Sequence, residues 1–196
     1  SYDKMALVIE KHKDQFLEKK YSRAIHSLAP AENTDKTPVL VTTGEATADG
    51  RKKLTRADIV ALKKKFDKLK IPKEGRILVL CADHVADLPE TDQRFEKQVY
   101  DYTTGKIAKM YGFDVYEYDE CPYYDTTTLK KKAFGAVIGD NDRQCSVAFT
   151  TKRAMRADGS TKSYLRPADL DPENQQNIFS MRTYTICLPL RNEGFG

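Results

Sequence analysis

The chain has 196 residues, of which 40% are hydrophobic and 32% are charged, and its formal net charge is +4. This composition excludes a disordered chain and predicts a folded, soluble protein with one sizeable core. No stretch approaches the roughly 20 apolar residues that span a bilayer, and the N-terminus lacks a signal-peptide pattern. We therefore expect synthesis in the cytoplasm and no membrane contact.

The charge is unevenly distributed along the chain. Residues 1–75 are basic, residues 76–142 are acidic, and the remainder is mildly basic. Segregated charge of this kind favours head-to-tail association between copies through complementary patches. The simpler interpretation, lysines on solvated helix faces, applies equally well to any single patch.

The cysteines are widely spaced and include no CxxC pair, and the three histidines are scattered. Free thiols are expected in a reducing cytoplasm, and a zinc site is unsupported without a closely spaced ligand pair. No cofactor is expected, since the sequence also lacks a P-loop, GxGxxG and GxSxG.

The first half of the chain predicts two helices separated by an irregular stretch. Apolar residues at helical spacing predict a helix over 3–28, which Ala29-Pro30 ends. Residues 31–53 have no helical period, and Asp49-Gly50 is a strong turn signal, so an extended loop or β-hairpin is expected. A second helix over 55–70 begins with a capping-box variant, Thr55 with Asp58, and is followed by a buried strand over 77–81.

The second half of the chain gives weaker patterns. We expect partial helix over 91–111 and a half-buried strand over 113–118, which alternates cleanly. Further along we expect a strand at 134–138, a helix at 146–155 and a loop over 158–177. One last alternating strand is expected from 177 to 188, before Pro189.

Two phrases resemble the major capsid (coat) proteins of tailed phages, from a phage or an integrated prophage. The first is a helix ending in Asp67-Lys68, then Ile71-Pro72, Glu74-Gly75-Arg76, a hydrophobic strand and Asp87-Leu88. The second matches the pattern G-x-I-x-x-x-x-GF-x-V/I-Y-E and begins at Gly105. Its remaining matched residues are Ile107, Gly112, Phe113, Val115, Tyr116 and Glu117.

The resemblance implies a fold class of α/β (α+β mixed), the coat-protein fold with a spine helix, peripheral sheet, axial domain and extended loop. It divides the chain into an N-terminal helix (1–30), extended loop or β-hairpin (31–54), spine helix and peripheral region (55–112), axial region (113–180) and returning C-terminal strand (181–196). Proteins of this class are generally longer and begin with an extended arm. Here a helix starts almost at once, so that arm is expected to be absent, trimmed or outside this sequence.

The resemblance implies a structural role rather than an enzymatic one: an icosahedral shell of a double-stranded DNA phage, made in the bacterial host cytoplasm. Partners would be copies of the chain, scaffold or portal proteins, and packaged DNA through weak non-specific contact. The basic face of the expected spine helix comprises Lys63, Lys64 and Lys68. The residues of the loop that would contact a neighbouring subunit are Val39, Val41, Thr43, Gly44, Asp49 and Gly50.

Two alternatives remain open. A basic nucleic-acid-binding module would use the lysine-rich helix 56–70, although no aromatic residues are interleaved there. A metal-dependent phosphoryl-transfer enzyme would use the carboxylates of residues 114–142, although Asp114 and Glu117 point to opposite faces of their strand.

Overall fold

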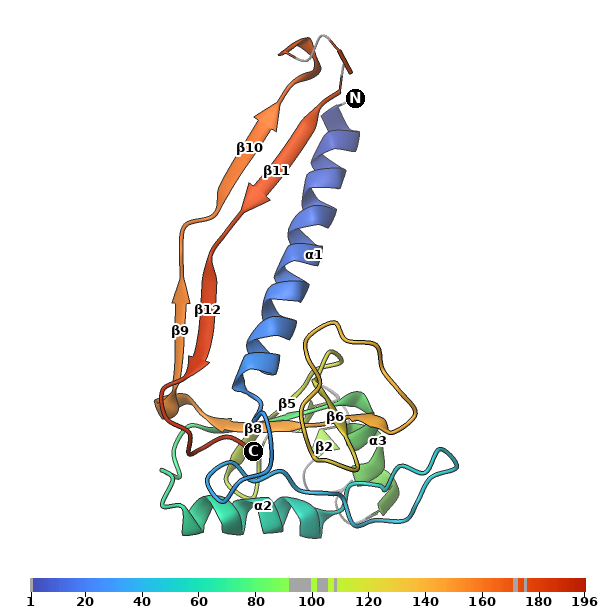
Figure 1. The fold of residues 1–196 in the computed structure, drawn as a ribbon, viewed down its shortest axis with the longest axis vertical. Helices are drawn as coiled ribbons and strands as arrows, with labels where there is room; N and C mark the ends of the chain where they lie inside the picture. Colours follow the sequence, from blue (N-terminus) through green and yellow to red (C-terminus); the bar gives the residue numbers. More distant parts are fainter. Residues whose placement is uncertain (1, 92–99, 102–105, 108, 171–172, 175) are drawn as a thin grey trace.

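The computed structural model describes residues 2–91, 100–101, 106–107, 109–170, 173–174 and 176–196. The molecule consists of a long arm that projects from a mixed α/β body (Figure 1). The arm pairs one helix with a long β-ribbon, and the body holds a small sheet with a helix below it. The expectation of a mixed helix and sheet fold is therefore confirmed.

The arm joins the first helix of the chain to strands from its last quarter. Helix α1 (Tyr2–Leu28) runs beside the ribbon of β9 (Ala154–Asp158), β10 (Lys162–Arg166), β11 (Ile178–Arg182) and β12 (Thr185–Pro189). Strand β12 pairs antiparallel with β9, and β10 pairs antiparallel with β11. Among the described residues, the ribbon is two strands wide and α1 is the helix that lies along it.

The body is organised around a four-stranded sheet in the order β4-β5-β1-β8. Strand β1 (Arg76–Leu80) lies between β5 (Phe113–Glu117), which is parallel to it, and β8 (Val147–Thr150), which is antiparallel. Strand β4 (Lys109–Met110) pairs antiparallel with β5. The outer edge of β8 pairs with residues 194–196, which brings the side chain of Phe195 into the core.

Short elements complete the body and the tip of the arm. Helix α3 (Ala82–Thr91) follows β1, and β6 (Tyr123–Asp125) forms a hairpin with β7 (Asp142–Gln144). The remaining elements are β2 (Tyr100–Asp101), β3 (Lys106–Ile107) and the 3₁₀ turns η1 (Thr151–Arg153) and η2 (Ala168–Leu170).

Helix α2 (Arg56–Lys68) has the predicted capping box, with Thr55 and Asp58 each bonding to the other's backbone N–H. Its apolar stripe packs against the sheet and forms the largest buried cluster of the body. Phe66 is fully buried and meets the ring of Phe113 edge-on, with ring centroids 5.7 Å apart. The helix therefore begins where its capping box predicted, and it buries the face that lies against the sheet.

The turn between α2 and β1 depends on a buried arginine. The Arg76 side chain is 2% exposed, and its Nη2 donates to the Ile71 carbonyl at 2.7 Å and pairs with Asp67 at 2.8 Å. Its Nε donates to the Pro72 carbonyl at 3.0 Å. Gly75 has φ +71, and a Cβ there would lie 2.3 Å from Thr151 Oγ1, so only glycine fits. This geometry explains the Gly-Arg pair of the first phrase.

Four sequence predictions of secondary structure are wrong. The expected helix at 146–155 is strand β8 followed by η1 and β9, because Ala148 is fully buried between β1 and the C-terminal segment. Residues 134–138 form an exposed turn, since Gly135 adopts φ +78 and no strand pairs with them. The expected loop 158–177 contains β10, whose pairing with the distant β11 leaves no local signal.

The fourth error concerns 91–111. The described part after Thr91 forms short strands instead of helix, while 92–99, 102–105 and 108 lie outside the described residues. Tyr111 and Gly112 both have positive φ and form the tight turn between β4 and β5. The last strand, expected over 177–188, is divided into β11 and β12.

Replacing Arg76 with methionine should lower the free energy of unfolding by about 3 kcal/mol, because two buried carbonyls lose their donors. Denaturant unfolding would measure this. The matched control is Lys152→Met, which removes the exposed ion pair with Glu74 and should change stability by less than about 0.5 kcal/mol. Equal effects of the two substitutions would contradict the anchoring role of Arg76.

Candidate interaction surfaces

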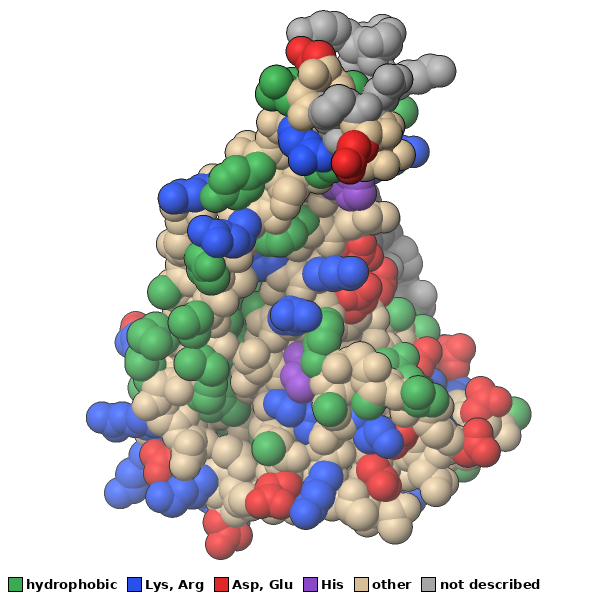
Figure 2. Space-filling model, turned by 45° about the horizontal axis from the view of Figure 1, so that its top comes forward, with side chains coloured by type: hydrophobic (Ala, Val, Ile, Leu, Met, Phe, Trp, Pro, Cys, Tyr) green, Lys and Arg blue, Asp and Glu red, His purple; other side chains and the backbone are tan. Residues whose placement is uncertain are grey.

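The arm carries most of the large hydrophobic side chains that the chain exposes to solvent. Figure 2 shows hydrophobic side chains gathered on the ribbon side of the arm, with lysines and arginines among them. Exposure of apolar side chains over such an area is typical of a protein contact surface. These residues are Leu7, Val8, Leu17, Tyr21, Met155, Tyr164, Leu165, Leu170, Ile178, Tyr184, Ile186, Leu188 and Leu190.

The strand register assigns the ribbon side chains to two faces. Cross-strand partners share a face, and faces alternate along each strand. Lys20 of α1 pairs with Asp158 at 2.8 Å, so the face of Asp158 and its partner Thr185 is turned toward the helix. In β11, Phe179 and Met181 are half-buried and the residues between them are exposed, which assigns Phe179 and Met181 to the same inner face.

The Asp158 carboxylate is the main polar contact between ribbon and helix. It accepts from Lys20, from the Thr185 hydroxyl at 2.6 Å and from the Arg156 guanidinium. These hydrogen bonds, that of Lys20 first, hold the pKa of Asp158 far below its ordinary value. The inner face is therefore occupied within the chain itself.

The outer face of the ribbon, turned away from α1, has no partner among the described residues. Near the body it is apolar, with the pairs Met155–Leu188 and Ala157–Ile186. Toward the tip it becomes basic and aromatic, because the pair Lys162–Arg182 lies beside Tyr164. We call this surface, comprising Met155, Ala157, Lys162, Tyr164, Arg182, Ile186 and Leu188, the outer ribbon face.

Helix α1 has a corresponding surface of opposite charge. Ile9, Phe16 and Lys20 are half-buried and lie on the ribbon side. Steps of three and four residues place another set of side chains on one exposed stripe turned away from the ribbon. We call this set, comprising Leu7, Glu10, Asp14, Leu17, Glu18 and Tyr21, the free helix face.

The acidic charge of the free helix face continues onto the body. Glu18 lines a shallow depression together with Glu117, Tyr118, Asp119 and Glu120. Burial, with Glu120 and Glu18 nearby, raises the pKa of Tyr118 to about 12. Figure 2 shows acidic side chains on the side of the arm away from the ribbon.

The predicted intersubunit loop, 31–54, is fastened to its own body at several points. Val39 packs against a buried cluster of the body, and Thr43 donates from its N–H and hydroxyl to the Asp58 carboxylate. The N–H of Gly44 donates to the Lys53 carbonyl at 3.0 Å, and Arg143 donates to the Asp49 carbonyl at 2.7 Å. Val41 is 53% exposed, and Asp49 and Gly50 are exposed at the turn. Gly44, Asp49 and Gly50 thus lie in one short hairpin, and Val39, Val41 and Thr43 precede it.

The strongest attachment of this loop is an ion pair that the sequence did not indicate. The two terminal guanidinium nitrogens of Arg51, Nη1 and Nη2, donate to Asp87 at 2.5 and 2.8 Å, and the N–H of Leu54 donates to the same carboxylate at 2.8 Å. Asp87 is 2% exposed. Burial alone would raise the pKa of Asp87, but the bonds from Arg51 and Leu54 outweigh it and lower that pKa.

A cavity of about 470 Å³ lies between the 31–54 loop, α2 and the β6–β7 hairpin. Its walls are mainly apolar, with Leu54, Ile59 and Leu80 among them. Among its polar lining residues, His84 Nδ1 lies 2.7 Å from the Ser146 hydroxyl, and burial lowers the pKa of His84. Cavities of this size are ordinary for small-ligand sites, but His84 and Ser146 already contact each other.

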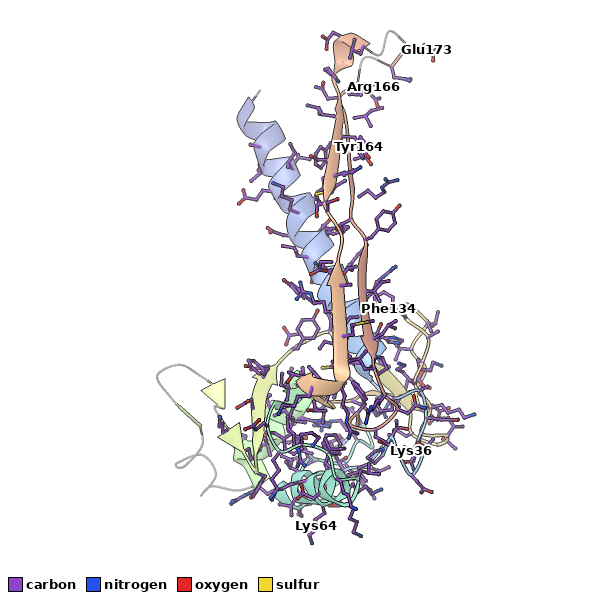
Figure 3. All side chains as sticks on the ribbon, turned by 90° about the vertical axis from the view of Figure 1, so that its left-hand side faces the viewer. Lys36, Lys64, Phe134, Tyr164, Arg166 and Glu173 are labelled. Atoms are coloured by element: carbon purple, nitrogen blue, oxygen red, sulfur yellow. The ribbon has the colours of Figure 1, made fainter. Side chains whose placement is uncertain are left out.

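The predicted basic face of α2 is solvent-exposed at the end of the molecule opposite the tip of the arm. Figure 3 shows Lys64 at that end, far from Glu173 near the tip. Lys63 makes a long ion pair with Asp67 within the helix, at 3.9 Å. Lys64 and Lys68 are exposed and form no ion pair with the residues that the structure describes. Such lysines can contact phosphates but carry no groove-reading geometry.

The carboxylates of 114–142 form no metal site among the described residues. Asp114 pairs with Lys109, and Asp142 pairs with Lys132 and accepts from the Gly139 N–H. Asp125 accepts from the N–H groups of Thr127 and Thr128 in a turn. Within the described ranges, no three His, Cys, Asp or Glu side chains come close enough to hold a metal ion. The four cysteines are free thiols.

Comparison with solved structures gives three similar chains. A chain of Mycobacterium phage Che8 has 14% identity and a TM-score of 0.63, over 96% of this chain and 60% of that one. A chain of the capsid structure of the cyanophage P-SCSP1u has 13% identity and a TM-score of 0.66, over 97% and 64%. A chain from the asymmetric unit of the bacteriophage PhiM1 mature capsid has 14% identity and a TM-score of 0.56, over 94% of this chain and 60% of that one.

These likenesses show the fold: the chain folds as phage capsid proteins do, which confirms the predicted coat-protein fold. It spans about 60% of the length of the solved chains it matches. No protein-family model and no curated protein matches the sequence. In the part of the chain that the structure describes, no helix is long and apolar enough to cross a membrane.

The sequence did not identify the free helix face or the outer ribbon face as surfaces. The one sequence signal for the free helix face is the four-residue spacing of Glu10, Asp14 and Glu18. The ribbon face depends on the pairing of β9 with β12 and β10 with β11, so no local pattern could reveal it.

Replacing Asp87 with asparagine should loosen the 31–54 loop and lower the free energy of unfolding by about 2–4 kcal/mol near neutral pH, since Arg51 loses a buried partner. The pKa of Asp87 is depressed on folding, so its stabilisation is present above about pH 4 and is lost as pH falls through the folded value. The difference between variant and wild type should therefore shrink in acid.

Limited trypsin digestion would show the loosening as faster cleavage at Arg51, Lys52 and Lys53. The control is Asp83→Asn, because the Asp83 side chain is 60% exposed and lies 3.9 Å from Arg51. Cleavage at the wild-type rate in the Asp87 variant would contradict the attachment.

Proposed function

We propose that the chain is a structural subunit of an icosahedral phage capsid, which assembles with copies of itself around double-stranded DNA. The observation that carries this proposal is the unfinished burial of the arm. A two-stranded ribbon with one helix is too thin to bury its apolar residues, and such ribbons are marginally stable alone. Neighbouring subunits would supply the missing layer.

The fold shared with phage capsid chains supports the same conclusion. In this proposal the protein resides in the virion capsid after synthesis in the bacterial host cytoplasm, and scaffold and portal proteins are further partners.

We assign the role of spine helix to α1. The sequence resemblance placed that helix at 55–70, but α2 has 13 residues and α1 has 27. A helix that supports an elongated domain must run its length, and α1 lies along the ribbon (Figure 1). Helix α2 instead covers one side of the body sheet. The 31–54 hairpin remains our candidate for contact with a neighbouring subunit through its exposed turn.

The direct test is negative-stain electron microscopy of the gene product expressed with its genomic neighbours. We expect closed shells or capsomer rings, with the 31–54 loop cleaved by protease in isolated subunits and protected in assemblies. A chain that stays monomeric under these conditions at high concentration would contradict the proposal. Equal cleavage of the loop in both states would contradict its intersubunit role alone.

A weaker contact with packaged DNA is favoured by Lys64 and Lys68 on the exposed face of α2. Replacing both with glutamate should reduce retention on a DNA column and flatten its dependence on salt, because fewer phosphates are neutralised. Replacing them with arginine keeps the charge and should preserve retention. Unchanged retention in the glutamate variant would exclude this face as the DNA contact.

A further inference from the structure

The outer ribbon face contains an unfavourable pair of like charges. Lys162 and Arg182 are direct cross-strand partners, and both point away from α1. Like charges placed directly opposite each other destabilise an antiparallel pair. Neither side chain forms an ion pair with a residue that the structure describes; Arg182 lies over the Tyr184 ring, 5.2 Å from its centroid. An external carboxylate placed between them would remove the repulsion.

On the free helix face, the like charges that repel one another are negative. Glu10, Asp14 and Glu18 follow one another at four-residue steps, where like charges on a helix repel. None of the three is ion-paired within the described part of the chain. Leu7, Leu17 and Tyr21 flank them and are each 43–52% exposed. An external cation beside an apolar surface would relieve this face as well.

The two faces match in level along the arm. The contact between Lys20 and Asp158 fixes one common level. Lys162 lies four residues beyond Asp158, or about 13 Å at the rise of a strand. That distance corresponds to about nine residues of helix, which is the level of Glu10 and Asp14.

Apolar residues match in the same way. Tyr164 lies about 20 Å beyond Asp158 and reaches the level of Leu7. Ile186, about one strand residue toward the body from Thr185, reaches the level of Tyr21. Charged groups therefore face charged groups, and apolar groups face apolar groups, when two arms lie side by side in the same direction.

We propose that the outer ribbon face of one copy binds the free helix face of the next copy, with the arms parallel and in level register. Lys162 and Arg182 would meet Glu10 and Asp14 of the neighbouring copy. This is a head-to-tail contact between two different surfaces, so repetition builds a ring or row of arms with helix and ribbon alternating. It rests on the proposed capsid function and names the surfaces through which copies associate.

Reversing the charge of either face should block association. The helix variant carries Glu10→Lys with Asp14→Lys, and the ribbon variant carries Lys162→Glu with Arg182→Glu. Each variant alone would bring like charges together, and we expect its dissociation constant to rise about a hundredfold. Sedimentation velocity over a concentration series would measure this, and added salt should weaken wild-type association. The matched control, Lys65→Glu with Lys73→Glu, alters two exposed lysines of the body, changes the net charge as the ribbon variant does and should associate normally.

Mixing the two variants gives the decisive test. Every contact in an alternating mixture is attractive, because reversed helix meets reversed ribbon and normal helix meets normal ribbon. Equal amounts of the two variants should therefore recover association near the wild-type level, which also shows that both are folded. A second test uses Glu10→Cys on one copy and Lys162→Cys on another, which should give a cross-linked dimer only when both are present.

The outcomes separate this proposal from the capsid function itself. Wild-type assembly that neither reversal impairs, or a mixture that does not recover, overturns the pairing of these faces and leaves the capsid function standing. If another segment of the same chain covered the outer ribbon face, the Lys162→Cys variant would cross-link within one chain. That result would also overturn the proposed pairing of the two faces. Failure of the wild-type protein to associate under any condition contradicts the capsid function instead.

Discussion

The buried guanidinium of Arg76 joins the end of α2 to the start of β1, and the arrangement of the body depends on that contact. It donates to the carbonyls of Ile71 and Pro72 in the turn that follows the helix, and it lies 5.8 Å from the ring centroid of Phe66. With this turn fixed, α2 covers the sheet and β1 takes its central place between β5 and β8. Asp67, whose pKa the hydrogen bond from Arg76 lowers, completes the anchor.

The arm buries its apolar side chains less completely than the body does. In the body, helix, sheet and C-terminal segment together exclude water from Phe66, Phe113 and Phe195. In the described part of the arm, a single helix covers one face of a two-stranded ribbon, and the outer ribbon face and the free helix face are exposed. The arm thus retains apolar and charged surface that an assembly of copies could bury, and the proposed function rests on this difference.

The 31–54 loop combines both behaviours. Its base is held by the Arg51–Asp87 pair and by Thr43 on Asp58, while its turn at Asp49-Gly50 is exposed. The sequence pointed to the loop and to its turn, because a long stretch without helical period and an Asp-Gly step are local features. Its attachment could not be foreseen, since Arg51 and Asp87 are brought together only when α3 folds against the loop.

The sequence by itself determined the local elements whose signals are local: α1, the capped helix α2, the glycine turn before Arg76, and the alternating strand β5. It also pointed to the coat-protein fold through the two phrases that carry these elements. The tertiary structure decided the pairing of β10 with β11 and of β9 with β12, the strand state of 147–150, and the two faces of the arm. These depend on contacts between residues far apart in the chain, whose register no short pattern encodes.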